Sequence, residues 1–228
     1  MDDLTSRIKA LAKREGVSLI GVASARGWKV ARGRSPKDIL PGARSIIVLA
    51  MPVPDKVIEE ATVGERENVK KAIRREMERV GSKIMEILTK NGYVNVMPSG
   101  NIPSNAKQLP GLIPLKYAAC RAGLGAIGKS SLLITPQYGP RVRLAAIVTS
   151  APLTPDKPLN VDFCGTCIVC EKVCVGKAFR EGRHDTEICW RAESELGEHV
   201  PGLPYKLCPA PCLKLCPVGK LKQKYRVS

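Results

Sequence analysis

The spacing of the cysteines constrains this chain more than any other feature of its sequence. Eight of the nine cysteines lie in two runs, Cys164-x2-Cys167-x2-Cys170-x3-Cys174 and Cys189 followed by Cys208-x3-Cys212-x3-Cys216-Pro217. Three thiolates at two-residue intervals can bind three corners of an iron–sulfur cube, and in two-cluster ferredoxins the fourth cysteine of such a run ligates the other cluster. The spacing therefore predicts two [4Fe–4S] clusters.

Exchanging the fourth cysteines between the runs assigns four ligands to each cluster. The first set is Cys164, Cys167, Cys170 and Cys216, and the second set is Cys174, Cys189, Cys208 and Cys212. Structural zinc is the alternative, but zinc sites favour pairs of cysteines separated by a loop, and three cysteines within seven residues fit that pattern poorly. Cys120 is left over and is expected to be a small buried hydrophobe.

Composition narrows the class of protein. No apolar run approaches the roughly 18 residues of a membrane span, and the start MDDLTSRIKALAKREG is unlike a signal peptide, so we expect a cytoplasmic protein that does not bind membranes. Cysteines in that compartment indicate metal or redox chemistry rather than disulfides.

The net charge of +16 predicts an anionic cofactor, an anionic substrate or an acidic protein partner. A lysine-, arginine- and glutamate-rich surface of the thermophile type explains the same charge without a partner. Binding to nucleic acid, tRNA included, rests on charge alone, and the 4% aromatic content gives it no stacking platform.

The apolar pattern divides the chain near residue 158. Helical spacing predicts helices over residues 4–12, 67–91 and 115–122, and apolar β-branched runs predict strands over residues 18–23, 45–51, 131–134 and 142–149. A proline-rich segment, APLTPDKPLN, follows as a predicted linker. We therefore expect an α+β domain over residues 1–158 and a ferredoxin-like domain with two clusters over residues 159–228.

A glycine-rich loop, Gly123-Leu-Gly125-Ala-Ile-Gly128-Lys129-Ser130, matches both the dinucleotide and the P-loop patterns. The helix-like stretch before it and the strand-like stretch after it are the reverse of a P-loop, and no acidic residue follows about 20 residues on to bind a ribose. The loop still offers backbone N–H groups beside a lysine, which suits a phosphate or another anionic group.

The order of these blocks resembles the epoxyqueuosine reductase family, which is related to reductive dehalogenases. The resemblance is carried by AGLGAIGKSSLLITPQYGPRVRLAAIVTSAPLTPDKP, by the following CGTCIVCEKVC, and by REGVSLIGVASA and LPGARSIIVLAMPVP near the N-terminus. It implies a nitroreductase-like domain that binds cobalamin, joined to a two-cluster ferredoxin domain. Carried over, Gly123, Gly125, Gly128 and Lys129 would contact the corrinoid. Because glycines let a flat ring approach the backbone, Gly125→Val is expected to abolish cobalamin binding and leave the iron content unchanged.

The chain also departs from that family. The family's catalytic aspartate would fall at Leu109, and no Asp or Glu occurs from Ile87 to Pro155. The tryptophan of the family's glycine motif is Ala126, and the family's C-terminal repeat region is missing from this sequence. We therefore expect a short member and assign no catalytic residue. Tyr117 and Tyr138 are alternative proton donors, with packing as their simpler role.

The acid-free stretch carries seven cations, which we expect either to focus a positive field on the cofactor cleft or to point into solvent. They are Lys90, Lys107, Lys116, Arg121, Lys129, Arg141 and Arg143.

Two functional hypotheses follow. The first is a reductase that passes electrons through two clusters to a bound corrinoid. The second is an electron-transfer protein without its own substrate that reduces the corrinoid or flavin of a partner. Either protein needs a low-potential electron donor of the ferredoxin or flavodoxin type.

Overall fold

The computed structural model describes residues 3–29, 34–98, 113–201, 203 and 206–219. Contacts between Cα atoms divide the chain into two compact units. Unit 1 comprises Met1–Met51, Ile73–Leu124 and Arg143–Leu159, and unit 2 comprises Pro52–Ala72, Gly125–Val142 and Asn160–Ser228. The domain boundary near residue 158 stays a prediction, since these units are groups of residues in contact.

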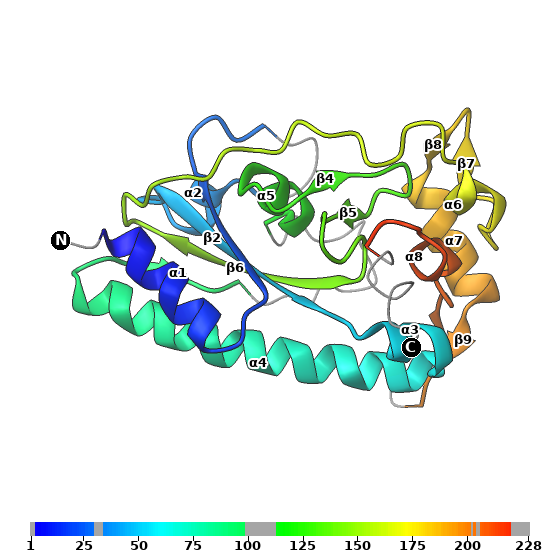
Figure 1. Cartoon of the computed structure of the whole chain (residues 1–228), viewed down its shortest axis with the longest axis horizontal. Coiled ribbons are helices and arrows are strands. Elements are labelled where there is room, and N and C mark those ends of the chain that lie inside the picture. The colour runs from blue at the N-terminus through cyan, green and yellow to red at the C-terminus, as the bar shows by residue number, and fades with distance from the viewer. Residues whose placement is uncertain (1–2, 30–33, 99–112, 202, 204–205, 220–228) are drawn as a thin grey trace, which may run out of the picture. The chain divides into compact units, whose positions relative to one another are not determined.

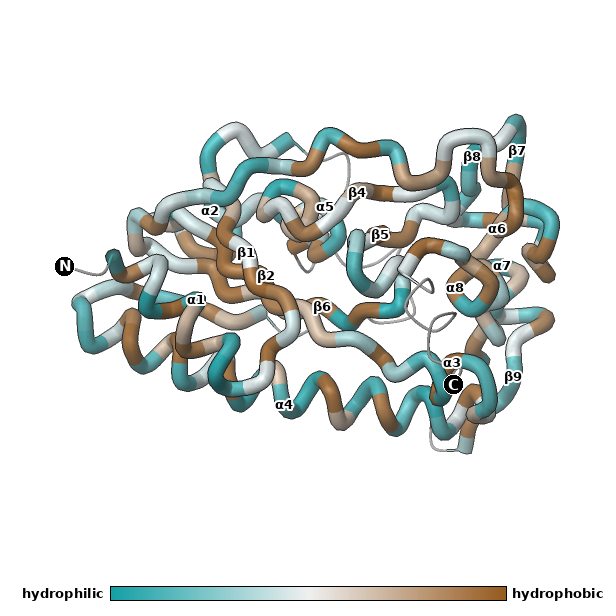
Figure 2. Tube along the Cα trace, viewed as in Figure 1, coloured by the Kyte–Doolittle hydropathy of each residue, from teal (hydrophilic) through white to brown (hydrophobic). Residues whose placement is uncertain are grey.

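Unit 1 is built around a four-stranded sheet with the strand order β1-β2-β6-β3 (Figure 1). β1 (Leu19–Ser24) runs antiparallel to β2 (Ser45–Pro52), with Leu19 opposite Ala50, and β3 (Asn95–Val96) runs antiparallel to β6 (Val142–Thr149). The strands that were predicted from apolar runs over residues 18–23, 45–51 and 142–149 are confirmed as β1, β2 and β6. Figure 2 shows the hydrophobic colour along β1 and β2.

Helices of unit 1 cover the sheet. α1 (Leu4–Arg14) and α4 (Val63–Lys90) place Ile8, Met77 and Ile84 in one core with Ile47 and Leu49 of β2. α5 (Leu115–Arg121) packs on β1, where a side chain on Gly21 would overlap the carbonyl oxygen of Ala122. These three helices were predicted from their apolar spacing. The short helices α2 (Pro36–Ile39) and α3 (Asp55–Glu60) were not, because four to six residues show no period.

The proline-rich segment after β6 is packed rather than free. Ala151 and Leu153 are buried, and the carboxylate of Asp156 accepts hydrogen bonds from Lys9 Nζ at 2.6 Å and from the backbone N–H of Val22 at 2.8 Å. The expectation of a linker was therefore wrong for this part of it, because a paired aspartate and two apolar side chains fix the segment to unit 1.

Unit 2 contains short elements. They are α3, a hairpin of β4 (Ala126–Ile127) and β5 (Leu133–Ile134), α6 (Val169–Lys172), a hairpin of β7 (Phe179–Arg180) and β8 (Arg183–His184), α7 (Thr186–Leu196), β9 (Glu198–His199) paired with β10 (Lys206–Leu207), and α8 (Pro211–Lys214). Among the described residues after Asn160, only Ala178 and Phe179 are buried hydrophobics. The cysteine-rich segment of unit 2 thus has few buried apolar residues of its own, which is typical of segments that are stabilised by metals or disulfides. No helix in the described part of the chain is long and apolar enough to span a membrane.

Candidate metal centre

The first predicted set of cysteines is assembled in unit 2 from two parts of the chain. Cys164 and Cys167 lie on the loop that enters α6, Cys170 lies within α6, and Cys216 follows α8. Burial raises the pKa of Cys216, and the neighbouring Cys164 and Cys167 act in the same direction. Burial likewise raises the pKa of Cys170, again with Cys164 and Cys167 as neighbours. Cys216 therefore has two of its three predicted partners, Cys164 and Cys167, as electrostatic neighbours, and the full ligand set stays a prediction.

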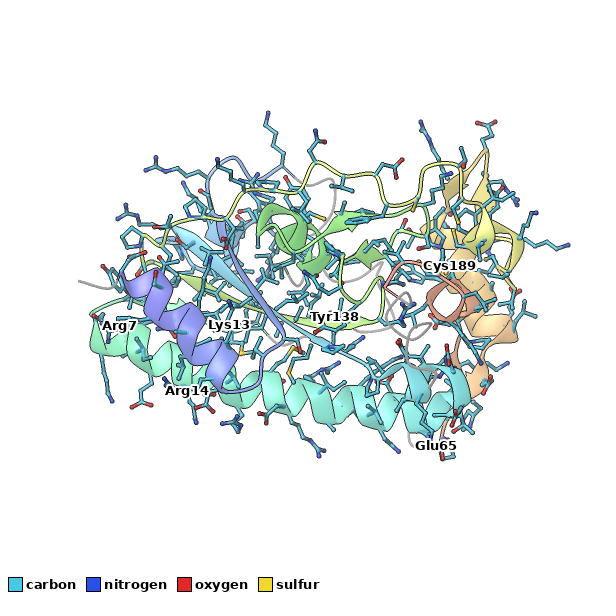
Figure 3. All side chains as sticks on the ribbon, viewed as in Figure 1. Arg7, Lys13, Arg14, Glu65, Tyr138 and Cys189 are labelled. Atoms are coloured by element: carbon cyan, nitrogen blue, oxygen red, sulfur yellow. The ribbon has the colours of Figure 1, made fainter. Side chains whose placement is uncertain are left out.

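The second set is assembled in the same way. Asp185 caps α7 through hydrogen bonds from the backbone N–H groups of Glu187 and Ile188, and this helix presents Cys189 (Figure 3). Burial raises the pKa of Cys212 to about 12, and three neighbouring thiols act in the same direction. These neighbours are Cys208, Cys189 and Cys174.

The donors around the sulfurs suit thiolate ligands. The backbone N–H groups of Lys129, Ala178 and Ala210 donate to the Sγ atoms of Cys164, Cys174 and Cys208 at 3.4, 3.3 and 3.3 Å. N–H bonds to sulfur stabilise the charged form and tune the potential of an iron–sulfur cluster. Within the residues that the structure describes, no three His, Cys, Asp or Glu side chains surround a single ion position. A cubane does not require such a point, because each cysteine binds a different iron atom. The residues present thus fit two cubanes in their grouping and donors.

The glycine-rich loop contacts the first set of cysteines. Its lysine donates from Nζ to the carbonyl oxygens of Gly165 and Cys167 at 2.7 and 3.1 Å. α5 precedes the loop, β4 lies within it and β5 follows it, so the loop lacks the strand-before, helix-after arrangement of a P-loop, as its sequence context predicted.

The glycines of this loop have partners that the sequence analysis did not foresee. A Cβ on Gly125 would overlap the carbonyl oxygen of Ile134, and a Cβ on Gly128 would lie 2.8 Å from Ile134 Cγ1. Gly123 has a φ of +70°, and its Cβ would lie 2.5 Å from the carbonyl oxygen of Lys157. Each glycine is therefore required by close packing within its own unit. Their contact with a corrinoid stays a prediction.

Arg141 is a second residue that contacts the first set of cysteines, and the sequence alone marked it only as one of seven cations. Its side chain is 2% exposed and pairs through Nε with Asp55 Oδ1 at 2.8 Å. Its Nη1 and Nη2 atoms donate to the carbonyl oxygens of Cys216 and Val218 at 3.0 and 2.6 Å.

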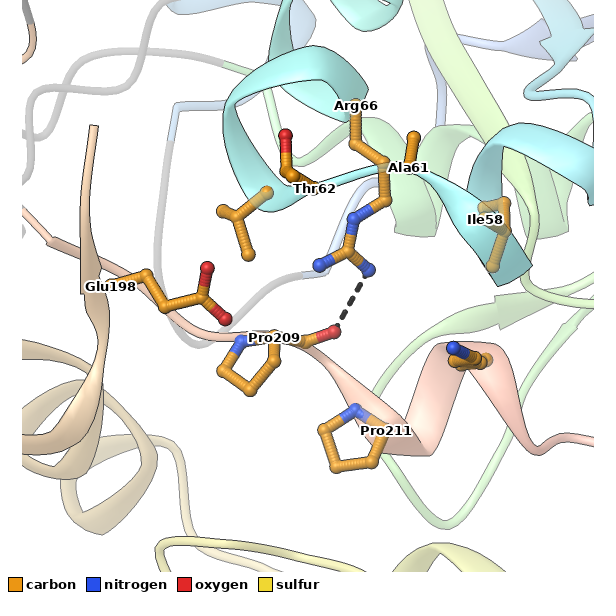
Figure 4. Close-up of a pocket in the computed structure, with 9 residues that line it drawn as sticks. Ile58, Ala61, Thr62, Arg66, Glu198, Pro209 and Pro211 are labelled. Atoms are coloured by element: carbon orange, nitrogen blue, oxygen red, sulfur yellow. Dashed lines mark hydrogen bonds between the residues drawn. The ribbon is translucent and has the colours of Figure 1, made fainter. Parts of the chain in front are cut away.

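A pocket of about 280 Å³ adjoins the second set (Figure 4). Arg66, 8% exposed, points into it and donates to the carbonyl oxygen of Pro209, directly after Cys208, at 2.9 Å. Lys214 donates to the carbonyl oxygen of Glu59 at 2.6 Å. Arg66 also lowers the pKa of Cys208, against a larger increase caused by burial. A cation thus adjoins each set of cysteines.

The cations of the acid-free stretch that the structure describes have partners within the protein, and the positive field that they were expected to focus on a cofactor cleft stays a prediction. Arg121 donates to the carbonyl oxygens of Gly27 and Arg26 and lies over the ring of Tyr117, while Lys90 pairs with Glu86. Lys129 and Arg141 are bound to carbonyl oxygens, and Lys116 and Arg143 also have interactions, so the six cations that the structure describes all have partners in the protein. Lys107 and Leu109 lie outside the described residues.

The two tyrosines lie in different units. Tyr117 makes an edge-to-face contact with Trp28, with 4.9 Å between the ring centroids. Tyr138 donates its backbone N–H to Thr135 Oγ1 in the turn before Arg141. Both placements show packing or turn contacts, and a proton-donor role for either tyrosine stays a prediction.

No family model matches the chain. It is 26% identical to the epoxyqueuosine reductase of Bacillus cereus over 224 residues, covering 82% of this chain and 56% of that protein. It is 29% identical to the tetrachloroethene reductive dehalogenase of Sulfurospirillum multivorans over 210 residues, covering 79% of this chain and 41% of that one. The chain therefore spans about half the length of these relatives.

The fold comparison agrees. A solved reductive dehalogenase structure, described in terms of B12-dependent dehalogenation, has a TM-score of 0.69 and 21% identity and covers 96% of this chain and 33% of that one. The chain thus has the mixed α+β fold of such reductases, with a cysteine-rich C-terminal region. It is a distant homologue, over most of its length, of the family of epoxyqueuosine reductases and reductive dehalogenases.

Proposed function

We propose that this protein is an iron–sulfur reductase that carries two [4Fe–4S] clusters and delivers electrons to a bound corrinoid. The proposal is supported by the cysteine spacing, by cysteines distant in sequence that are electrostatic neighbours within each predicted set, and by backbone N–H groups that donate to Cys164, Cys174 and Cys208. The relatives support it, since one of them is described as B12-dependent. In this proposal unit 1 is the nitroreductase-like part and the cysteine-rich segment is the ferredoxin-like part.

The chain's own residues would perform three tasks. The cysteines would hold the clusters as thiolates, and the N–H groups of Lys129, Ala178 and Ala210 would stabilise the negative charge on sulfur. The surrounding carbonyl-bound cations would fix the ligand loops. When bound, the clusters supply one-electron transfer and a corrinoid supplies a strongly reducing cobalt centre.

The alternative, an electron-transfer protein without its own substrate, is favoured by one observation. Lys129 was expected to bind the amide and phosphate groups of a corrinoid. Its ammonium group instead donates two hydrogen bonds to the carbonyl oxygens of Gly165 and Cys167. The two functions differ in whether the chain itself binds a corrinoid.

Anaerobic reconstitution tests both. We expect about eight irons per chain, the content of two cubanes, and a change in the cobalamin spectrum on addition of the loaded protein. Stoichiometric zinc without iron would contradict both functions. Full iron loading without cobalamin binding in either oxidation state of cobalt would support the electron-transfer function. Binding of FMN would show that the protein uses a flavin and not a corrinoid.

The proposed electron donor is a low-potential ferredoxin or flavodoxin with an acidic surface. A net charge of +16 on this chain would steer such a partner. Because the Debye length falls from about 30 Å at 0.01 M salt to about 3 Å at 1 M salt, we expect the second-order rate of cluster reduction to fall steeply over that range. A rate that does not depend on salt, measured by stopped-flow absorbance, would contradict an acidic donor.

A further inference from the structure

Two motifs that precede the cysteine-rich segment touch the first set of cysteines. One is Gly128–Lys129, at the end of the glycine-rich loop, and the other is the turn from Tyr138 to Arg141. Neither contains a cysteine. Both belong to unit 2 together with the cysteines that they contact.

The first motif holds the loop of Cys164 and Cys167. The backbone N–H of Lys129 donates to Cys164 Sγ at 3.4 Å, and its ammonium group bonds the carbonyl oxygens of Gly165 and Cys167. A Cβ on Gly128 would lie 3.1 Å from Cys164 Sγ. That distance is tighter than ordinary contact, so glycine gives the sulfur the room it occupies.

The second motif holds the loop of Cys216. Arg141 bonds the carbonyl oxygens of Cys216 and Val218 and is itself fixed by Asp55. The two backbones also meet directly: Gly139 has a φ of +54°, and a Cβ there would overlap the carbonyl oxygen of Val218. A planar guanidinium that donates to two carbonyls and a carboxylate fixes the loop in one orientation.

We propose that Gly128–Lys129 and Tyr138–Arg141 are structural parts of the first cluster site, and that Lys129 and Arg141 are positioning residues for it. They hold the loop of Cys164 and Cys167 and the loop of Cys216 at the spacing of one cluster before the cluster binds. Cys216 is remote in sequence from its partners, so without these contacts cluster insertion must also order a long loop, which costs conformational entropy. This inference rests on the proposed function, because it presupposes two clusters.

The charge of Lys129 also affects the redox chemistry. Each cluster becomes more negative when it accepts an electron, and a nearby positive charge favours the reduced form. Lys129 therefore raises the reduction potential of the first cluster, whereas the charge of Arg141 is compensated by its ion pair with Asp55. This effect distinguishes a cation placed at the cluster from one that only stabilises the fold.

The test uses the full chain, reconstituted anaerobically, in three variants. Lys129→Met removes one cation, Arg141→Lys keeps the charge but loses the planar fork, and Lys177→Met removes an exposed lysine after the same cysteine run as a control. Iron content, the rate of iron uptake and the electron paramagnetic resonance signal of each reduced cluster are measured. Cys170→Ser and Cys189→Ala identify the signals of the first and the second cluster.

We expect Lys129→Met and Arg141→Lys to load the first cluster at least twofold more slowly or less completely, while the second cluster loads as in the wild type. The first cluster that does form in Lys129→Met should have a lower reduction potential. Lys177→Met should match the wild type in the loading, the uptake rate and the reduction potential of the first cluster.

The inference would be overturned if Lys129→Met and Arg141→Lys both matched the wild type in iron content, in the rate of iron uptake and in the reduction potential of the first cluster. So would a Lys129→Met protein with two unchanged clusters and a weakened affinity for cobalamin, which would assign the lysine to the corrinoid. A wild-type protein without iron would instead contradict the proposed function, so the two failures are distinguishable.

Discussion

Cys189→Ala is expected to lower the iron content of the reconstituted protein from about eight to about four atoms per chain, because it removes one ligand of one cubane. Cys189 lies on α7 and is a neighbour of Cys212, whose pKa burial raises to about 12. The loss should be confined to that set, since the first set shares no cysteine with it. Iron analysis and absorbance in the visible region measure the result.

Cys120→Ala is the matched control for this loss. Cys120 lies on α5 in unit 1, outside both sets, and its removal should leave about eight irons. Loss of all iron from Cys189→Ala would show that the two clusters do not assemble independently. Retention of eight irons would show that Cys189 is not a ligand, and the crossed assignment would then be wrong.

Gly125→Val has the second large expected effect, and it corrects an expectation from the sequence. The sequence predicts loss of cobalamin binding with unchanged iron. In the structure a Cβ at Gly125 would overlap the backbone carbonyl of Ile134, on the partner strand of the β4–β5 hairpin. Backbone atoms move less readily than side chains, so we expect a destabilisation of about 1–3 kcal/mol or more. The same hairpin carries Lys129, and iron loading of the first cluster should fall as well.

Gly42→Val serves as the control for this substitution. Gly42 is exposed, and its Cβ would lie 4.0 Å from Ser150 Cβ, an ordinary contact. Chemical denaturation followed by circular dichroism, together with iron analysis, compares the two variants. A Gly125→Val protein with wild-type stability and full iron, but without cobalamin affinity, would restore the original interpretation of the loop.

Much of unit 1 was predictable because its elements are long enough to show a period. The apolar residues of α4 recur at helical spacing over many turns, and β2 and β6 are continuous apolar runs. The two sets of cysteines were predicted from their spacing, because iron–sulfur clusters restrict how far apart in sequence their cysteine ligands lie. The pairing of β9 with β10 had no such signal, because two-residue strands depend on tertiary contacts.

The roles of Lys129 and Arg141 could not be read from the sequence for a different reason. A lysine beside glycines is typical of anion sites, and nothing in the sequence shows that its partners are the carbonyl oxygens of Gly165 and Cys167. Arg141 stands next to Val142, the first residue of β6, and resembles any charged residue at the start of a strand. Only the folded chain shows that Asp55, far away in sequence, is its ion-pair partner.

The discontinuous construction of unit 2 has a consequence for how the protein matures. Its three segments are synthesised at separate times, and the carbonyl acceptors of Arg141 belong to Cys216 and Val218, near the end of the last segment. A chain that has been synthesised only as far as β6 contains Asp55 and Arg141 but lacks the carbonyl acceptors of Arg141 and the predicted ligand Cys216. The predicted first cluster site can therefore be completed only after all three segments of unit 2 have been synthesised.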